Sequence, residues 1–133
     1  MDYDFDSALQ IRRDVLGREY VDRILAGSPF TAPFQEFVTR YAWGEGWSDD
    51  SIDLKTRSLI TVAVVTALGQ ADEVRLHVGG ALRNGCTADE LAAVLKHVAI
   101  YAGVARAVAG IYIADAELSK EADASDSSTD DRS

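Results

Sequence analysis

The sequence contains one cysteine, two prolines and two histidines among its 133 residues. The lone cysteine, Cys86, excludes an intrachain disulfide framework and any CxxC motif, and it is typical of a protein from a reducing cytoplasm. The longest strongly apolar run, LITVAVVTALG, is far shorter than the roughly 20 residues of a membrane-spanning helix. The first ten residues, MDYDFDSALQ, lack the apolar segment of a secretory signal. We therefore expect a soluble cytoplasmic protein that does not enter a membrane.

Positive charge is also scarce, because 13 Lys and Arg stand against 22 Asp and Glu, for a net charge of -9. This balance repels phosphate backbones and anionic lipid, so neither nucleic acid nor a membrane surface is an expected partner. The length predicts one domain. The last residues, 121–133, are polar and acidic and offer nothing to bury, so we expect a disordered tail after a helical domain over 1–120.

Hydrophobic periodicity and breaker residues predict an all-α domain of six or seven helices. Asp53 has the position of a helix N-cap, and Thr87 to Glu90 form a capping-box pattern. The segment WGEGWSDDS is predicted to be a loop. The β-branched residues that follow it also suit a strand, but their length and the terminal Gly69 favour a buried helix. The expected helices cover 4–16, 19–26, a segment from Pro33, 54–69, 71–84, 88–102 and 104–119.

The segments VGGAL and YAGVARAVAG, in the second half of the chain, are rich in glycine and alanine. A glycine inside a helix costs about 1 kcal/mol relative to alanine, so close helix packing is expected to offset it. We predict that the last helix packs against a second subunit. Tight packing within one chain is the alternative, since small residues allow close approach in both settings.

An acid and an imidazole occur one helical turn apart at Glu73 and His77, and His97 and Tyr101 repeat that spacing. Residues four apart lie on one face of a helix, so these four side chains are able to line one cavity if their helices pack together. The alternatives are a solvated ion pair for Glu73 and His77, a hydrogen-bonded core histidine, and a packing tyrosine. No HExxH motif or cysteine cluster occurs, so we expect no metal site.

Five sequence motifs occur in a recognisable order: RRDVLG, FQEFVTRYAWGEGW, KTRSLITVAVVTAL, EVRLHVGGALRNG and TADELAAVLKHVAIYAGV. Together they resemble the carboxymuconolactone decarboxylase family, in particular its 4-carboxymuconolactone decarboxylase branch, over residues 8 to 118. The resemblance implies an alkylhydroperoxidase-D-like helical fold that assembles as a homotrimer or homohexamer. Gln70 and Glu73 stand where related peroxidases carry two cysteines, which argues against disulfide-based peroxide chemistry.

The resemblance implies a carboxy-lyase that converts 4-carboxymuconolactone to 3-oxoadipate enol-lactone and CO2, in the protocatechuate branch of the β-ketoadipate pathway. The residues at Ala105, Val108 and Tyr112 differ from those usual in the motifs of this family, and these differences leave the exact substrate open. The alternatives are a related decarboxylase for another cyclic carboxylic acid and a non-catalytic helical oligomer.

The implied substrate carries its own electron sink, because electrons left by CO2 flow to the lactone carbonyl and form a 2-oxyfuran. No cofactor is therefore expected. We hypothesise that Glu73 and His77 are the catalytic pair, with His77 as the proton donor. Arg57 and Trp43 also have structural alternatives, an ion pair and core packing. The predicted substrate-binding residues are Arg57, His97, Tyr101, Trp43 and Arg106.

Overall fold

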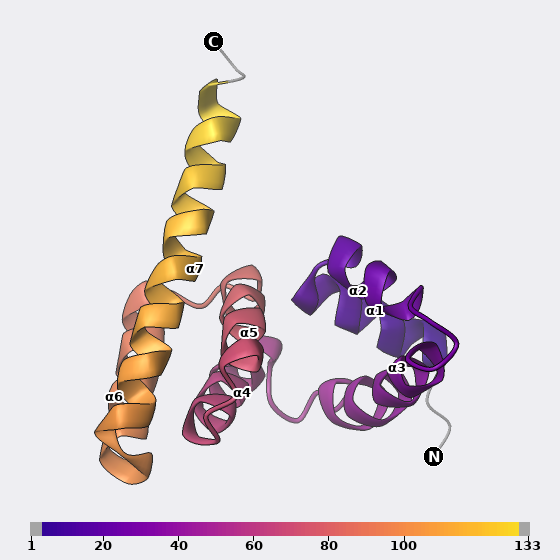
Figure 1. The fold of residues 1–133 in the computed structure, drawn as a ribbon, viewed down its shortest axis with the longest axis horizontal. Coiled ribbons are helices and arrows are strands. Elements are labelled where there is room, and N and C mark those ends of the chain that lie inside the picture. The colour runs from indigo at the N-terminus through magenta and orange to yellow at the C-terminus, as the bar shows by residue number, and fades with distance from the viewer. Residues whose placement is uncertain (1–3, 131–133) are drawn as a thin grey trace. The chain divides into compact units, whose positions relative to one another are not determined.

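The computed structural model describes the backbone of residues 4–130 and the side chains of residues 4–124. Within that part the protein has seven α-helices, one π-helical segment and no strand, which confirms the all-α prediction (Figure 1). By Cα proximity the chain divides into two compact units, Met1–Arg57 and Ser58–Ser133. The single domain expected over 1–120 stays a prediction. The elements are α1 Phe5–Leu16, α2 Arg18–Leu25, α3 Ala32–Val38, η1 Thr39–Trp47, α4 Leu54–Ala67, α5 Ala71–Arg83, α6 Ala88–Ala102 and α7 Val104–Asp130.

The first unit is organised around a buried arginine. Arg12, on α1, donates from Nη1 to the Thr39 hydroxyl at 2.9 Å and from Nη2 to the Gln35 side-chain oxygen at 2.7 Å. Val15 of α1 and Val21 of α2 are fully buried in the same unit. A buried guanidinium is stable only when its donors find acceptors, so Arg12 fixes α1 against α3 and the start of η1.

The predicted loop WGEGWSDDS is wrong in its first half, because helical structure continues as the π-helix η1 to Trp47. Trp43 and Trp47 stack with ring centroids 4.6 Å apart and an interplanar angle of 17°. The Ser48 hydroxyl donates to the Trp43 carbonyl at 2.6 Å and closes this segment. Burial of two indoles outweighs the turn-forming tendency of Gly44 and Gly46, which is why local composition misled the prediction.

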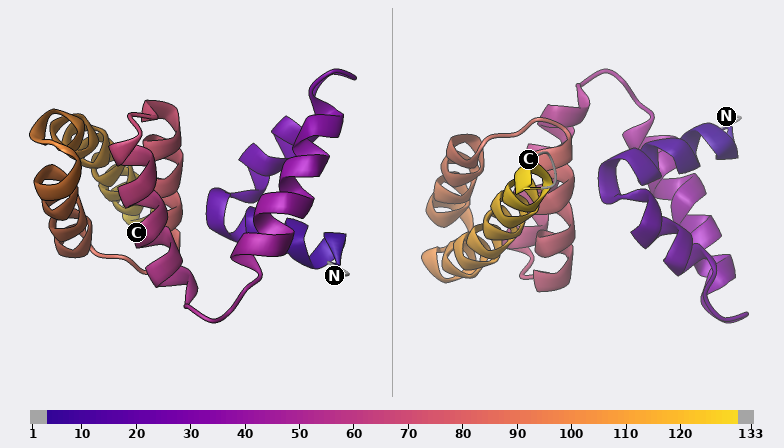
Figure 2. Two further views of the ribbon diagram at one scale, coloured as in Figure 1. Left: turned by 90° about the horizontal axis from the view of Figure 1, so that it is seen from below. Right: turned by 90° about the horizontal axis from the view of Figure 1, so that it is seen from above.

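The second unit packs α4, α5, α6 and α7 around one apolar core. Val62 of α4, Val78 of α5 and Leu91 and Leu95 of α6 are almost fully buried in it. Helix α7 lies along α6 and also contacts α5 (Figure 2). The core therefore includes side chains from every helix of the unit, and the unit itself holds five of the seven predicted site residues.

The predicted helix caps are present. The Asp53 carboxylate accepts the Thr56 amide at 2.7 Å, and this backbone hydrogen bond lowers the pKa of Asp53 below its usual value. Thr87 and Glu90 form the reciprocal capping box at the start of α6. Gly103 has φ +114°, a conformation that favours glycine, and it separates α6 from α7.

Helix α7 approaches α4 closely at Gly110. A Cβ at this position would lie 2.8 Å from Thr66 Cγ2 and 3.0 Å from Leu95 Cδ2. At least one of the small residues in the last helix therefore serves packing within the chain, the alternative weighed for that sequence.

Helix α7 also continues to Asp130, past residue 120, where the sequence predicts that order ends. The end of the predicted tail, residues 131–133, lies outside the described residues, and the boundary at 120 stays a prediction. Over the residues that the structure describes, no helix is both long and apolar enough to span a bilayer.

Candidate active site

The acid–imidazole pair lies on α5. His77 Nε2 and Glu73 Oε2 are 3.5 Å apart, a separation that makes an ion pair when the imidazole is protonated. His77 is buried, with 7% of its surface exposed, whereas the Glu73 side chain is 52% exposed. The i, i+4 spacing on α5 produces this arrangement, because such residues lie on one face of a helix. The pair thus combines a proton carrier shielded from water with a carboxylate at the surface.

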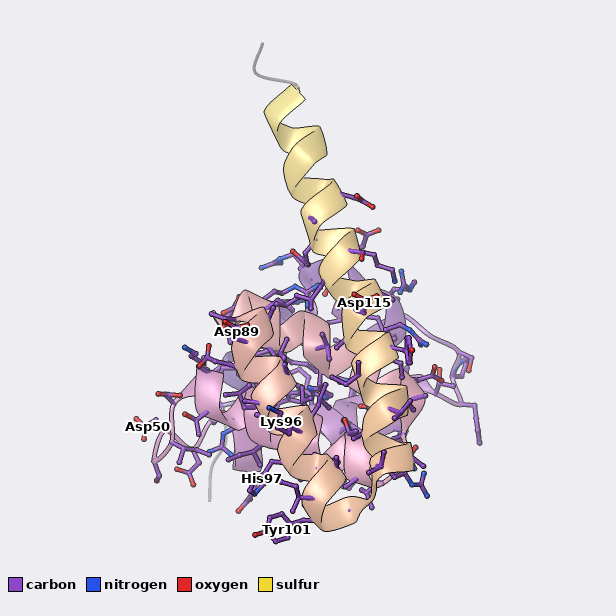
Figure 3. All side chains as sticks on the ribbon, turned by 90° about the vertical axis from the view of Figure 1, so that its left-hand side faces the viewer. Asp50, Asp89, Lys96, His97, Tyr101 and Asp115 are labelled. Carbon is purple, nitrogen blue, oxygen red and sulfur yellow. The ribbon has the colours of Figure 1, made fainter. Side chains whose placement is uncertain are left out.

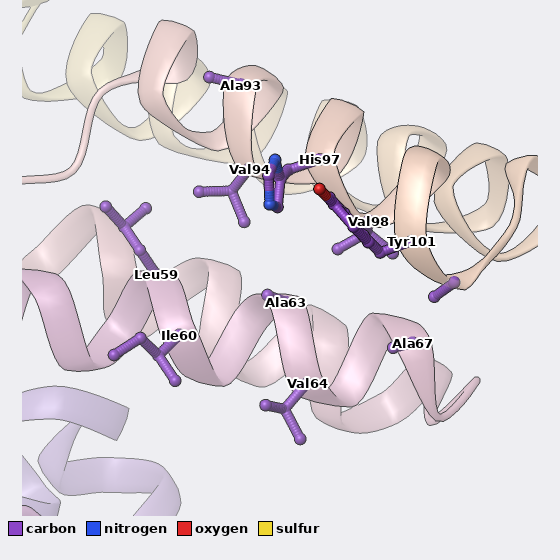
Figure 4. A pocket seen from close by; sticks show the side chains of 11 residues that line it. Leu59, Ile60, Ala63, Val64, Ala67, Ala93, Val94, His97, Val98 and Tyr101 are labelled. Carbon is purple, nitrogen blue, oxygen red and sulfur yellow. The ribbon is translucent and has the colours of Figure 1, made fainter.

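His97 and Tyr101 lie one turn apart on α6, where their ring centroids are 4.8 Å apart. Both side chains line an open hollow of about 680 Å³ between α4 and α6. The other walls are aliphatic, including Leu59 and Ala63 of α4 and Val94 of α6 (Figure 4). Asp89 lies at the start of α6, and His97 and Tyr101 lie toward the other end of the same helix (Figure 3). This hollow suits a flat, partly apolar molecule that has polar groups at one edge.

The four side chains expected to line one cavity do not all line the hollow between α4 and α6. Glu73 and His77 are not among the residues that line the hollow of His97 and Tyr101. The reason is geometric: α4, not α5, provides the wall opposite α6 in this hollow. The structure thus brings the residues together as two pairs.

Arg106 lines a smaller hollow of about 300 Å³ between α4, α5 and α7. The remaining lining residues are small or aliphatic apart from Thr66, whose hydroxyl donates to the Val62 carbonyl at 2.6 Å. Gly69, with φ +72°, lies directly under the guanidinium, because a Cβ there would overlap Arg106 Nη1. The sequence predicts Arg106 as a site residue and Gly69 only as the end of a helix, so the position of this glycine under the guanidinium is found only in the structure.

The other two predicted residues lie in the first unit. Arg57 donates from Nη2 to the Asp49 carbonyl at 2.6 Å, a bond that holds the loop before α4. Trp43 is buried and stacked on Trp47. The Trp43 contact is the core packing given as its alternative, whereas the Arg57 contact is a hydrogen bond to a backbone carbonyl and not the ion pair named above. A role in substrate binding stays a prediction for both.

Metal ligands do not gather in the part of the chain that the structure describes. No group of three or more His, Cys, Asp or Glu side chains there is arranged to hold a metal ion. We therefore assign no residue a metal-binding role.

A comparison with known families matches residues 32–116 to the profile of the carboxymuconolactone decarboxylase family. A 4-carboxymuconolactone decarboxylase from Acinetobacter baylyi is 40% identical to this chain over 112 residues, which is 84% of each protein. The chain belongs to the carboxymuconolactone decarboxylase family. This confirms the resemblance seen in the sequence motifs, and the matched range includes every residue of both pairs and of the Arg106 hollow.

Two further relatives of this chain are also named as decarboxylases. A nitrosuccinic acid decarboxylase from Metarhizium robertsii is 41% identical over 100 residues, 74% of this chain and 70% of the relative. A 4-carboxymuconolactone decarboxylase from Pseudomonas putida is 45% identical over 42 residues, 31% of this chain and 88% of the relative. Relatives of nearly equal identity are thus named for two different acids.

Proposed function

We propose that this protein is a carboxy-lyase that converts 4-carboxymuconolactone to 3-oxoadipate enol-lactone and CO2 without a cofactor. The observation that carries the proposal is the 40% identity to the Acinetobacter enzyme over 84% of both chains. We also propose that the activity belongs to the β-ketoadipate pathway of aromatic catabolism and takes place in the cytoplasm.

The reaction breaks the bond between the γ-carbon of the lactone and its carboxylate. The electron pair left by CO2 moves through the ring double bond to the lactone carbonyl, and the dienolate takes one proton at carbon. Because the substrate absorbs the electrons, the protein has to bind two carboxylates, stabilise one developing oxyanion and deliver one proton. A positioned donor at such an oxyanion is typically worth about 3 kcal/mol.

We assign proton delivery to His77 and its orientation to Glu73. The imidazole is buried, so it is shielded from exchange with bulk water, and the Glu73 carboxylate lies 3.5 Å from its Nε2. A placed general acid contributes about 10²- to 10⁴-fold in rate. Burial of the donor beside a surface carboxylate supports this assignment over the solvated ion pair that the same spacing allows.

His97 and Tyr101 are proposed to bind the substrate ring. The hollow that they line provides aliphatic walls for a flat ring, and both side chains carry hydrogen-bonding groups at its edge. Glu73 and His77 do not line this hollow, and we propose that a second copy of the chain brings them to a shared site with His97 and Tyr101.

Assembly of several copies is supported by the apolar surface of α6 and α7. Tyr101 is 80% exposed and Tyr112 is 72% exposed, and Val104 and Val108 are exposed beside them in sequence. Large exposed apolar patches mark interaction surfaces. We propose a homotrimer or homohexamer, the assemblies implied by the resemblance.

Decarboxylation of a nitro-substituted dicarboxylic acid is the second candidate, favoured by the 41% identity to the nitrosuccinic acid decarboxylase. Nitrosuccinic acid carries a carboxylate on the carbon that bears the nitro group. Loss of CO2 sends the electron pair to the nitro oxygens, and protonation at carbon completes the reaction. Both candidates are therefore dicarboxylic acids whose own acceptor group takes up the electrons.

The test is to incubate the purified protein separately with 4-carboxymuconolactone and with nitrosuccinic acid, and to follow CO2 release. Turnover of the lactone at least tenfold faster, by kcat/KM, supports the first proposal, and the reverse order supports the second. The same protein after heat denaturation corrects for spontaneous loss of CO2. No turnover of either acid by folded protein would exclude both decarboxylations and favour the non-catalytic oligomer.

A further inference from the structure

The hollow between α4, α5 and α7 contains a single charged group among its lining residues, the guanidinium of Arg106. Its other walls are small, including Gly69, Ala105 and Ala109, so the space beside the guanidinium is not filled by side chains. About 300 Å³ lies at the lower end of the range for small-molecule pockets. The hollow therefore has the size and charge for a small anion.

Arg106 makes no ion pair or hydrogen bond with any other residue in the part of the chain that the structure describes. The two acids in the first turn of α5 are engaged elsewhere. Asp72 pairs with Arg75 at 2.9 Å, and Glu73 lies 3.5 Å from His77. Because Arg106 makes no such contact, its guanidinium is available to an anionic ligand, although the protein as a whole carries a net charge of -9.

Gly69 positions the guanidinium. Arg106 Nη1 occupies the space in which a Cβ of residue 69 would stand, so no other amino acid fits there without moving Arg106. Gly69 also has φ +72°, which a side-chain-bearing residue adopts only with strain. A backbone turn and an arginine position thus depend on the same glycine.

From this geometry we infer that Arg106, held over Gly69, binds a carboxylate of the substrate. The inference rests on the proposed function and adds to it the residue that selects a dicarboxylic over a monocarboxylic acid. Arginine is suited to this role, since its fork of donors matches a carboxylate in bidentate form. Arg57, the other arginine predicted to bind substrate, already donates to the Asp49 carbonyl, so the structure favours Arg106.

The inference is tested with succinate, a dicarboxylate that carries no electron sink and is not decarboxylated. Calorimetric titration gives its Kd for the natural protein, for Arg106→Gln and for Arg75→Gln. Arg75→Gln is the matched control, because it removes the same charge from an exposed arginine of the same unit. We expect Arg106→Gln to weaken succinate binding about 10- to 100-fold, as for loss of a charged hydrogen bond, and Arg75→Gln to leave it unchanged. Equal affinities for all three proteins would overturn the inference.

Competition with the reacting acid identifies the carboxylate as that of the substrate. Succinate is expected to inhibit CO2 release competitively, and Arg106→Gln is expected to raise KM with little change in kcat. Non-competitive inhibition that depends on Arg106 would show a separate anion site and would overturn the inference. If neither acid is decarboxylated, the proposed function fails, while succinate binding that is lost in Arg106→Gln still shows a carboxylate site at Arg106.

A substitution at Gly69 checks the geometry without removing the charge. Gly69→Ala displaces the guanidinium and is expected to weaken succinate binding about tenfold. Circular dichroism establishes whether the variant is folded. Natural succinate affinity in folded Gly69→Ala protein would show that the position of the guanidinium over this glycine does not matter, and would overturn that part of the inference.

Discussion

At the scale of single residues, Glu73 and His77 form a pair of unequal exposure. The imidazole is buried, whereas half of the carboxylate side chain faces solvent. Water screens the exposed carboxylate, so its attraction to the imidazole is weaker than that of a fully buried carboxylate would be. This difference sets the relative sizes of the effects expected from changing the two residues.

Glu73→Gln keeps the size of the side chain and removes its charge. We expect kcat for CO2 release to fall about 3- to 10-fold, because the protonated imidazole loses a screened neighbouring charge. Glu36→Gln is the matched control, since Glu36 is an exposed acid in another i, i+4 pair, with Arg40. A kcat for Glu73→Gln equal to that of the control would show that Glu73 does not assist His77.

The sequence predicts both site pairs as i, i+4 neighbours, because that relation depends only on helical geometry. It does not predict that α4 provides the wall facing His97 and Tyr101, because helix order does not determine which helices pack face to face. It also names both Arg57 and Arg106 as candidates for substrate binding. Only the structure shows that Arg57 is held by the Asp49 carbonyl while Arg106 lines a hollow.

At the scale of elements, the close crossing of α7 and α4 depends on Gly110. A Cβ there would come within 3.0 Å of two core side chains, Thr66 and Leu95. The helix capped by Thr87 and Glu90 carries Leu95 into this contact. Small residues in α7 thus have a measurable role within the chain.

Gly110→Ala is expected to destabilise the protein by about 1 to 3 kcal/mol through overpacking, less the gain of about 1 kcal/mol in helix propensity. Gly46→Ala is the comparison, because a Cβ at Gly46 meets nothing within 4 Å. The free energy of unfolding in urea measures both. A Gly110→Ala protein more stable than Gly46→Ala would show that α7 is not tightly packed against α4.

Several helix limits follow from the sequence, because a capping residue or a glycine marks them, whereas α7 continues to Asp130, beyond its predicted end at residue 119. Asp53, Thr87 and Gly103 are examples that the structure bears out. The π-helix η1 does not follow, because its two glycines indicate a loop and only the packing of Trp43 on Trp47 explains its helical form. Local signals thus predict helix ends, while tertiary packing produces this exception.

At the scale of the whole molecule, the exposed apolar residues of α6 and α7 predict self-association. An apolar hollow of about 480 Å³ runs between these helices and is lined in part by Val108, Ile111 and Tyr112. Burying apolar surface of this kind stabilises an assembly by a free energy of roughly 25 cal/mol per Å². A second copy of the chain is the occupant that the proposed trimer or hexamer provides.

Val108→Asp is expected to shift the protein to smaller species, because association would bury an unpaired carboxylate. Light scattering after size exclusion measures the molar mass. Lys120→Asp is the control, since Lys120 is an exposed residue of the same helix and pairs with Glu117. A natural protein of 14.4 kDa in solution, or an unchanged mass for Val108→Asp, would contradict an interface at this surface.

The most direct test of the account is the rate of CO2 release from the preferred acid by the natural protein and by His77→Gln. The variant has to keep the natural circular dichroism spectrum and molar mass for the comparison to hold. If His77 delivers the proton, kcat falls by at least about 100-fold. A folded His77→Gln protein that works within about threefold of the natural rate would contradict the central claim, since the buried imidazole would then take no part in the chemistry.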